Sequence, residues 1–282
     1  MNDQSPLQIE PFGEHRQLLS QETFLLAESL GVSFPVRGNI REQRLSESDD
    51  RLIWNKHGKL RAVQALRNIS LDLKTGDRLA IVGRNGSGKT TLLQVLGGIL
   101  SPSAGRLTYR GRVTSLININ LGIQPEASGH RNITLRGLAS GYSRKEIEQK
   151  RGEIAEFSEL GEFLSMPMMS YSAGMRMRLT FAIATAFTPE ILVLDEWLSA
   201  GDTAFKKKAT NRMQEFVGKA GILILASHSR QLILDNCEQA IWLDGGEIRE
   251  RGPVEEVLKA YESDSAPSPK TPEAHPFSTV KA

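Results

Sequence analysis

Residues 83–90 read GRNGSGKT, a glycine-rich segment that ends in a lysine and a threonine. The apolar run at 78–82 precedes this segment, and a helical pattern over 89–96 follows it. Glycines let backbone amides wrap around phosphate oxygens, and the helix adds the positive end of its dipole. The spacing therefore predicts a phosphate-binding loop between a strand and a helix. The alternative, a turn that merely joins the two elements, is weakened by Lys89 and Thr90 at the required positions.

Each residue type in this segment has an expected part in binding a nucleoside triphosphate. The ammonium group of Lys89 can reach the β and γ phosphates, and the hydroxyl of Thr90 can serve as a ligand of Mg²⁺. ATP and Mg²⁺ are therefore the expected cofactors. The residues expected to contact the nucleotide in this segment are Gly83, Asn85, Gly86, Ser87, Gly88, Lys89, Thr90 and Thr91.

A second candidate lies at residues 191–196, which read ILVLDE, a buried strand pattern that ends in two adjacent carboxylates. An apolar strand ending in Asp-Glu is common, and by itself it indicates only a solvated strand end. Downstream of a phosphate-binding loop, Asp195 is expected to hold Mg²⁺ through water. Glu196 is expected to polarise the water that attacks the γ-phosphate, as a general base.

These candidates need a sheet that brings strand ends together. The apolar runs at 78–82, 191–194 and 222–226 have the length of buried parallel strands, and a mostly helical stretch, about 125–187, lies between the first and the second. With 282 residues, 39% of them hydrophobic and 24% charged, the chain has the composition of a globular protein. We expect an α/β fold in one domain with an inserted subdomain.

Nearer the amino terminus, a strand-like segment at 24–36 and an alternating segment at 62–73 flank a polar stretch, 37–61, rich in Arg, Glu, Ser and Asp. The polar stretch is interpreted as a long loop or insertion in which Trp54 could act as an anchor. At the other end, residues 263–282 hold four of the twelve prolines, which predicts a flexible tail.

Residues 171–175 read YSAGM and are followed by a helical pattern, about two dozen residues before ILVLDE. Alone, Ser172 is an adequate helix N-cap. In this position the segment resembles the signature loop of ABC-type ATPases, usually LSGGQ, with the serine and the second glycine kept. The resemblance covers about residues 24–262, after an N-terminal extension at 1–23. It implies a P-loop NTPase of the ABC type, with a mixed sheet core and an inserted helical subdomain, and an ATPase activity.

Further roles follow from the resemblance. In this family the loop's serine and glycine, here Ser172 and Gly174, meet the γ-phosphate bound by the opposite subunit, so a second copy of the chain is the expected partner. The segment SAGD at 199–202 stands where the family places its dimer-contact loop. His228 matches the switch histidine, which senses the γ-phosphate and orients the attacking water; a lone histidine after a strand would otherwise be structural.

The resemblance also implies an aromatic ring that stacks on adenine. Phe34, just before Pro35 at the end of the first strand, is the candidate, and Trp54 competes with it. The family's metal-contact glutamine, between sheet and helical subdomain, is assigned to Gln124, although the spacing also allows Asn120.

Three segments, YSAGM, DEWLSAGDTAFKKK and LGIQPEASGHRNITLRG, look like those of exporters of O-antigen, capsular polysaccharide or teichoic acid. In those systems two ATPase subunits at the cytoplasmic face of the inner membrane serve a separate integral membrane permease, and lipid-linked glycan is the indirect substrate. The chain departs from the pattern in three places. Arg131 replaces a common glutamate, the 37–61 insertion is long, and no carbohydrate-binding domain follows residue 262.

Other classes fit less well. The formal net charge is +2, which lacks the basic surplus of a nucleic-acid binder, so no nucleic-acid partner is expected. ABC proteins that act on ribosomes or DNA usually carry two cassettes or a long coiled-coil insertion, and neither pattern is visible in the sequence. No run approaches the roughly 18 apolar residues of a membrane helix. An ATPase subunit of another ABC transporter, with a different substrate, stays an alternative.

Overall fold

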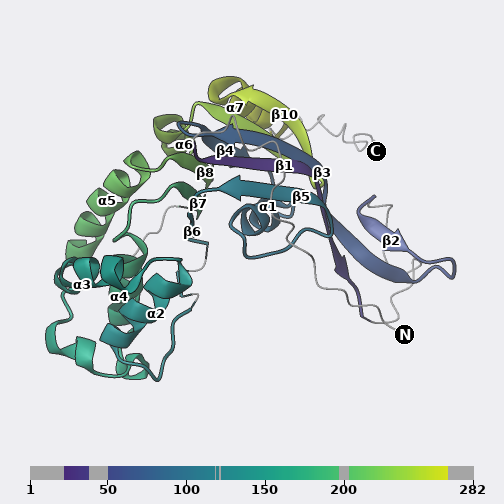
Figure 1. The fold of residues 1–282 in the computed structure, drawn as a ribbon. Coiled ribbons are helices and arrows are strands. Elements are labelled where there is room, and N and C mark those ends of the chain that lie inside the picture. Colours follow the sequence, from purple (N-terminus) through teal and green to yellow (C-terminus); the bar gives the residue numbers. More distant parts are fainter. Residues whose placement is uncertain (1–21, 38–49, 118, 121, 197–202, 266–282) are drawn as a thin grey trace, which may run out of the picture.

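The described part of the chain forms two sheets with helices packed against them and a separate group of helices (Figure 1). The computed structural model describes residues 22–37, 50–117, 119–120, 122–196 and 203–265. A four-stranded antiparallel sheet has the order β2-β3-β1-β5. Its strands are β1 (Phe24–Pro35), β2 (Leu52–Trp54), β3 (Leu60–Lys74) and β5 (Ala104–Arg110).

The central sheet has six strands in the order β10-β9-β4-β8-β7-β6. Its neighbours pair in parallel except for β9 and β10, which form an antiparallel hairpin at one edge. All five residues of β8 are buried, which is typical of a parallel strand covered on both faces. The strands are β4 (Arg78–Val82), β6 (Val113–Ser115), β7 (Ile191–Asp195), β8 (Ile222–Ala226), β9 (Gln239–Asp244) and β10 (Glu247–Pro253).

Two hydrophobic clusters cover the central sheet. One face packs against the antiparallel sheet and α1 (Lys89–Leu96), whose Leu92, Leu93, Val95 and Leu96 are buried. The opposite face packs against α5 (Thr203–Gly218), α6 (Arg230–Asn236) and α7 (Val254–Ser265). Burying each large apolar side chain contributes about 1.5–3 kcal/mol, so α1 is firmly held beneath the loop that precedes it.

The remaining helices form a separate group at the opposite end of the molecule from β2 (Figure 1). They are α2 (Gly129–Ala139), α3 (Arg144–Ser158) and α4 (Ala173–Ala184), with two short 3₁₀ helices, η2 (Gly161–Ser165) and η3 (Met168–Ser170). Each α-helix begins at a serine N-cap, and Ser143 with Glu146 forms a full capping box. The group buries its own cluster around Ile133, Ile147 and Leu179.

The strands expected at 78–82 and 222–226 and the helix expected at 89–96 lie at those bounds. The described part of the polar insertion, however, is not all loop: β2 pairs with β3, which begins inside the insertion at Leu60. The turn between them is stabilised by Asn55, whose Oδ1 accepts hydrogen bonds from the amides of His57 and Lys59 at 2.9 and 3.0 Å.

The expected start of the tail also differs, because α7 continues past residue 263 to Ser265. Side-chain contacts of Asp264, described below, hold this last turn. Among the described residues no helix is both long and apolar enough to cross a bilayer.

Candidate functional site

A cavity of about 500 Å³ opens where the carboxyl ends of β4, β7 and β8 meet. This edge of a parallel sheet is where α/β proteins bind ligands. Its lining comes from three parts of the chain: the insertion and β3, the glycine-rich loop with the start of α1, and the ends of β7 and β8. The lining residues are Arg51, Val63, Ala65, Asn85, Gly86, Gly88, Lys89, Thr90, Thr91, Asp195, Glu196 and His228.

The glycine-rich loop after β4 is closely packed against neighbouring backbone. A Cβ at Gly83 would lie 2.2 Å from the carbonyl oxygen of Leu243, and one at Gly88 would lie 2.8 Å from that of Ala65. Both glycines also have positive φ, 152° and 105°. Only glycine combines these dihedrals with this contact distance, so the loop's path is set by the core that surrounds it.

Lys89 lies folded into this loop. Its Nζ donates hydrogen bonds to the carbonyl oxygens of Gly83 at 2.6 Å and Arg84 at 3.1 Å. Partial burial lowers the pKa of Lys89 from its ordinary value, while the nearby carboxylates of Asp195 and Glu196 act in the opposite direction. An anion bound in the loop would offset the desolvation that disfavours the charged amine.

Thr90 and Asp195 bring two oxygen ligands together from different elements. The Thr90 hydroxyl, in the first turn of α1, donates to Oδ2 of Asp195, the last residue of β7, at 3.1 Å. A hydroxyl and a carboxylate are hard oxygen donors, and Mg²⁺ is usually held by one or two protein groups together with phosphates and waters. The pair therefore fits Mg²⁺. Among the described residues there is no group of three or more His, Cys, Asp or Glu side chains that could hold a metal ion.

Glu196 and His228 form the mouth of the cavity. The Glu196 amide donates to the carbonyl oxygen of Ala226 at 2.8 Å, which ties it to β8. Its φ is 63°, a left-handed conformation that costs a non-glycine residue about 1 kcal/mol. Both side chains are exposed, and Nε2 of His228 lies 3.7 Å from Oε1 of Glu196. A carboxylate beside an imidazole, both lining the cavity, can accept a proton from a water that attacks a bound substrate.

Gly83 and Ser87, although expected to contact the nucleotide, are buried and do not line the cavity. The Ser87 amide donates to Arg84, and its carbonyl oxygen accepts from the Gly246 amide. The Ser87 hydroxyl is buried without a hydrogen-bond partner in the described part of the chain. These residues shape the loop from behind in this conformation.

Phe34 and Trp54 are not among the residues lining the cavity. Phe34 lies directly across from Val63 in the pairing of β1 with β3, and Val63 does line it. Directly opposed residues in an antiparallel pair point to the same face, so Phe34 is at the rim and is 42% exposed. Trp54 pairs with Leu60, further along β3 and away from Val63.

Gln124 and Asn120 also lie outside the lining of the cavity. The Gln124 backbone is anchored to the buried Asn132 of α2 by two hydrogen bonds: its amide donates to Oδ1 at 2.8 Å, and its carbonyl accepts from Nδ2 at 2.9 Å. Gln124 is thereby attached to the helical group. The 199–202 segment, expected at the dimer contact, lies outside the described residues.

Ser172 and Gly174 are placed at the start of α4, exposed and separate from the cavity. Ser172 is the N-cap of the helix, and its Oγ accepts from the Met175 amide at 3.2 Å. The structure thus brings Lys89, Thr90, Asp195, Glu196 and His228 to one cavity and leaves the signature segment elsewhere on the surface.

Arg51 is a cavity residue that the sequence did not single out. Its Nη1 donates to the Gly86 carbonyl oxygen of the glycine-rich loop at 2.7 Å, so the insertion reaches over the site. In the sequence Arg51 is one of several arginines in a polar stretch, and no spacing distinguishes it. Its place depends on the pairing of β2 with β3.

The sequence of the chain is similar to those of known proteins. The family model for "ABC transporter" matches residues 66–199. O-antigen export system ATP-binding protein RfbE of Yersinia enterocolitica is 39% identical over 232 residues, 81% of this chain and 97% of the relative. Teichoic acids export ATP-binding protein TagH of Staphylococcus epidermidis is 39% identical, over 83% of this chain and 89% of the relative.

Another relative is longer than the matched part. O-antigen export system ATP-binding protein RfbB of Myxococcus xanthus is 41% identical over 71% of this chain, but the match spans only 46% of the relative's own length. Among solved structures, the ATP-binding subunit of an ABC transporter superposes with a TM-score of 0.60 at 19% identity, covering 85% of this chain and 94% of that one.

A dimeric bacterial ABC transporter cassette gives a TM-score of 0.57 at 19% identity, covering 82% of this chain and 98% of that chain. At such identities these two structures bear on the fold alone. The predicted fold class, an ABC-type P-loop NTPase with a mixed sheet, is confirmed. The chain belongs to the ATP-binding proteins of the ABC transporter family and is an ABC-type ATPase.

Proposed function

We propose that the chain is the ATP-binding and hydrolysing subunit of an exporter that moves lipid-linked polysaccharide across the cytoplasmic membrane. The observation that carries the ATPase part is the cavity itself, where Lys89, Asp195 and Glu196 meet at one edge of the central sheet. The polysaccharide part rests on relatives named for O-antigen and teichoic acid export, at 39% identity over most of their length.

The residues divide the reaction among them. Loop amides and Lys89 bind the β and γ phosphates of ATP, and Lys89 exchanges its two carbonyl partners for phosphate oxygens. Thr90 and Asp195 would hold Mg²⁺, which neutralises charge on the phosphates when bound. Glu196 accepts a proton from the attacking water. His228, whose Nε2 lies 3.7 Å from Oε1 of Glu196, orients that water toward the γ-phosphate.

A second copy of the chain completes the site in this proposal. Ser172 and Gly174 are exposed and outside the cavity of their own chain, which leaves them available to a γ-phosphate bound by the partner copy. A triphosphate that contacts both copies stabilises the closed dimer more than the open one, and this difference drives closure. Hydrolysis removes that contact, and the dimer reopens.

The roles proposed for Phe34 and Gln124 require different movements of the protein. Phe34, at the rim across from Val63, needs only a side-chain movement to stack on adenine. Gln124, or Asn120 in its place, would reach the metal only when the helical group moves toward the sheet. Because Gln124 is anchored to α2 through Asn132, its arrival would report that movement.

An integral membrane permease is the second proposed partner, which would place the chain peripherally at the cytoplasmic face of the inner membrane. Support comes from exposed apolar side chains of the helical group: Phe163 is 51% exposed, Met166 49% and Met169 67%. The Met169 amide donates to the Pro125 carbonyl oxygen at 2.7 Å, so the backbone of Met169 adjoins the segment that carries Gln124. A permease bound here would be displaced when the segment that carries Gln124 moves.

The test is to co-purify the membrane partner from the native host and to measure ATP hydrolysis with and without the host's lipid-linked glycan. We expect a permease in the complex and faster hydrolysis when the glycan is present. A permease whose transport substrate is not a glycan would contradict the polysaccharide assignment and leave the ATPase assignment standing. Failure of the purified complex to hydrolyse ATP would contradict both.

A further inference from the structure

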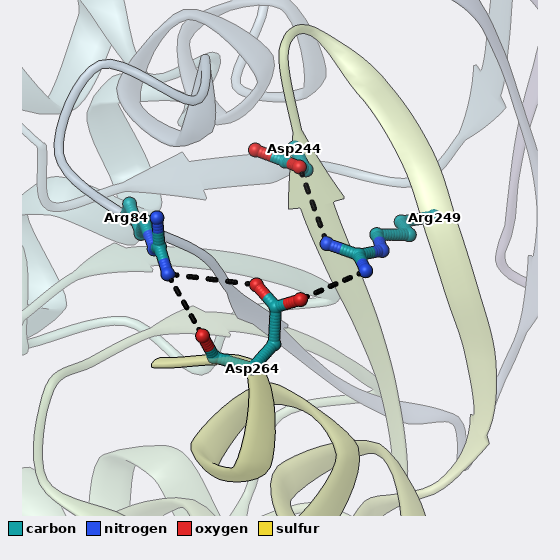
Figure 2. A network of polar contacts seen from close by, with 4 residues as sticks. All are labelled: Arg84, Asp244, Arg249 and Asp264. Carbon is teal, nitrogen blue, oxygen red and sulfur yellow. Dashed lines mark hydrogen bonds and ion pairs between the residues drawn. The ribbon is translucent and has the colours of Figure 1, made fainter. Parts of the chain in front are cut away.

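The last turn of α7 lies against the outside of the phosphate-binding loop (Figure 2). Arg84, the second residue of that loop, donates through Nη2 to the Asp264 carbonyl oxygen at 3.0 Å and approaches Asp264 Oδ2 at 3.5 Å. On the inside of the loop, the Arg84 carbonyl oxygen accepts from Nζ of Lys89 and from the Ser87 amide. One residue therefore joins α7 to the lysine of the site.

Asp264 is itself fixed from a second direction. Its Oδ1 accepts from Nη2 of Arg249 at 2.9 Å, so the carboxylate lies between two guanidinium groups (Figure 2). Arg249 also pairs with Asp244 at 3.5 Å and stacks over the ring of Trp242 at 4.0 Å. A network of four charged side chains anchored on a buried ring is better ordered than an isolated surface ion pair.

A second carboxylate of α7 contacts a different loop of the site. Nη1 of Arg230 donates to both oxygens of Glu262, at 2.7 and 2.8 Å. Arg230 is the first residue of α6 and follows His228 by two positions. The segment between is a tight turn: the Ser229 amide donates to Ser227 Oγ at 3.0 Å, and Ser229 caps α6. A shift of Arg230 therefore shifts His228.

The base of α7 is rigid, because Val257 and Leu258 are buried in the cluster that covers the central sheet. Tyr261 of the same helix contacts Trp242 edge to face, with ring centroids 5.7 Å apart. Glu262 and Asp264 follow directly and extend from this fixed base to the two loops. The core therefore fixes the position of α7, and the ion pairs of Asp264 and Glu262 fix the two loops relative to the helix.

We propose that α7 braces the ATPase site through two positioning residues, Asp264 for the phosphate-binding loop and Glu262 for the turn that carries His228. The inference rests on the roles proposed above for Lys89 and His228. Because the two carboxylates act on different parts of the reaction, their losses have different kinetic consequences. Asp264 affects nucleotide binding and therefore KM, whereas Glu262 affects the hydrolytic step and therefore kcat.

The experiment compares Asp264→Asn and Glu262→Gln with the wild-type chain in steady-state MgATP hydrolysis and thermal unfolding. Asp264→Asn removes the carboxylate charge 3.5 Å from Arg84 but keeps the main-chain carbonyl contact at 3.0 Å, so we expect it to raise KM about twofold with kcat kept. Glu262→Gln should lower kcat about two- to fivefold with KM kept, the range for losing one well-ordered ion pair. Glu256→Gln is the control: Glu256 is exposed on the same helix and pairs with no charged residue in the described part of the chain.

Charge reversal separates positioning from folding. Arg230→Glu should lower kcat, and the double variant Arg230→Glu with Glu262→Arg should restore it, without a matching change in thermal unfolding. The proposal is contradicted if both variants have wild-type KM and kcat. It is also contradicted if the kinetic effects only follow the change in unfolding temperature. If the wild-type chain fails to hydrolyse ATP, the proposed function is wrong. The role of α7 is then tested by comparing the affinities of Asp264→Asn and the wild-type chain for a fluorescent ATP analogue. Equal affinities would contradict the role proposed for Asp264.

Discussion

Two glycines, Gly83 of the phosphate-binding loop and Gly174 of the signature segment, show how differently the two halves of the proposed site are built. A Cβ on Gly83 would lie 2.2 Å from the Leu243 carbonyl oxygen, whereas the nearest atom to a Cβ on Gly174 would be Ser172 Oγ at 3.9 Å. The fold therefore requires glycine at the first position and leaves the second open. In the proposed dimer, the close approach of the partner's phosphate would supply the reason for glycine at position 174 that its own chain does not.

The same contrast extends to the side chains around the two glycines. At the cavity, Lys89 has two carbonyl partners and Thr90 is hydrogen-bonded to Asp195. At the signature segment, Ser172 bonds only locally, as a cap of its own helix, within the described contacts. One half is preorganised by the core, and the other is presented at the surface. The predictions that follow test this division, beginning with the chemistry of the preorganised half.

The largest effect is expected from Glu196→Gln. Removing the proposed base while keeping its shape should lower kcat about 10²- to 10⁴-fold, because general-base catalysis contributes that range. ATP should still bind, so an ATP-bound dimer should accumulate, measured by light scattering with saturating MgATP. Glu190→Gln, at the opposite end of β7, is the matched control and should keep its turnover. A Glu196→Gln chain that stays monomeric would argue against a site shared between two copies.

Next in size is Gly83→Ala, which tests whether the loop is set by the core. Overlap with the Leu243 carbonyl together with the strained φ should destabilise the fold by about 3 kcal/mol. Thermal or urea unfolding measures the change. Gly76→Ala separates the two causes, because Gly76 also has positive φ, 99°, but a Cβ there would meet no atom within 4 Å. If Gly83→Ala lowers the free energy of unfolding no more than Gly76→Ala does, the loop can shift to accommodate the methyl group.

A smaller effect of a different kind is expected from Gly174→Ala. Stability should stay unchanged or rise by up to about 1 kcal/mol, since alanine is the better helix residue and nothing nearby is displaced. ATP-dependent dimerisation of the Glu196→Gln chain should weaken about tenfold, because a methyl group would separate the segment from the partner's phosphate. Sedimentation at several ATP concentrations measures this. Unchanged dimerisation would remove the proposed reason for the glycine.

Much of the preorganised half follows from local sequence. The motif at 83–90 and the apolar strands at 78–82, 191–194 and 222–226 are each specified by a few neighbouring residues, and the structure has them at nearly the predicted bounds. The predictions that differ depend on contacts distant in the chain. Helix α7 extends to Ser265 because Arg84, 180 residues away, holds Asp264. A partner so distant in the sequence cannot be predicted from the residue pattern of a single segment.

Arg51 illustrates the same limit at the cavity itself, and it supports the smallest predicted effect. Its hydrogen bond to the Gly86 carbonyl, at 2.7 Å, ties the insertion to the phosphate-binding loop. Arg51→Gln should therefore raise KM for MgATP about two- to fivefold with kcat unchanged, the effect of losing one partly exposed charged contact to a binding loop. Lys56→Gln, an exposed charge in the β2 to β3 turn outside the cavity, should leave KM unchanged. Equal KM values for both variants would place the insertion outside the preorganised half, whereas an effect on kcat would extend Arg51's role to the hydrolytic step.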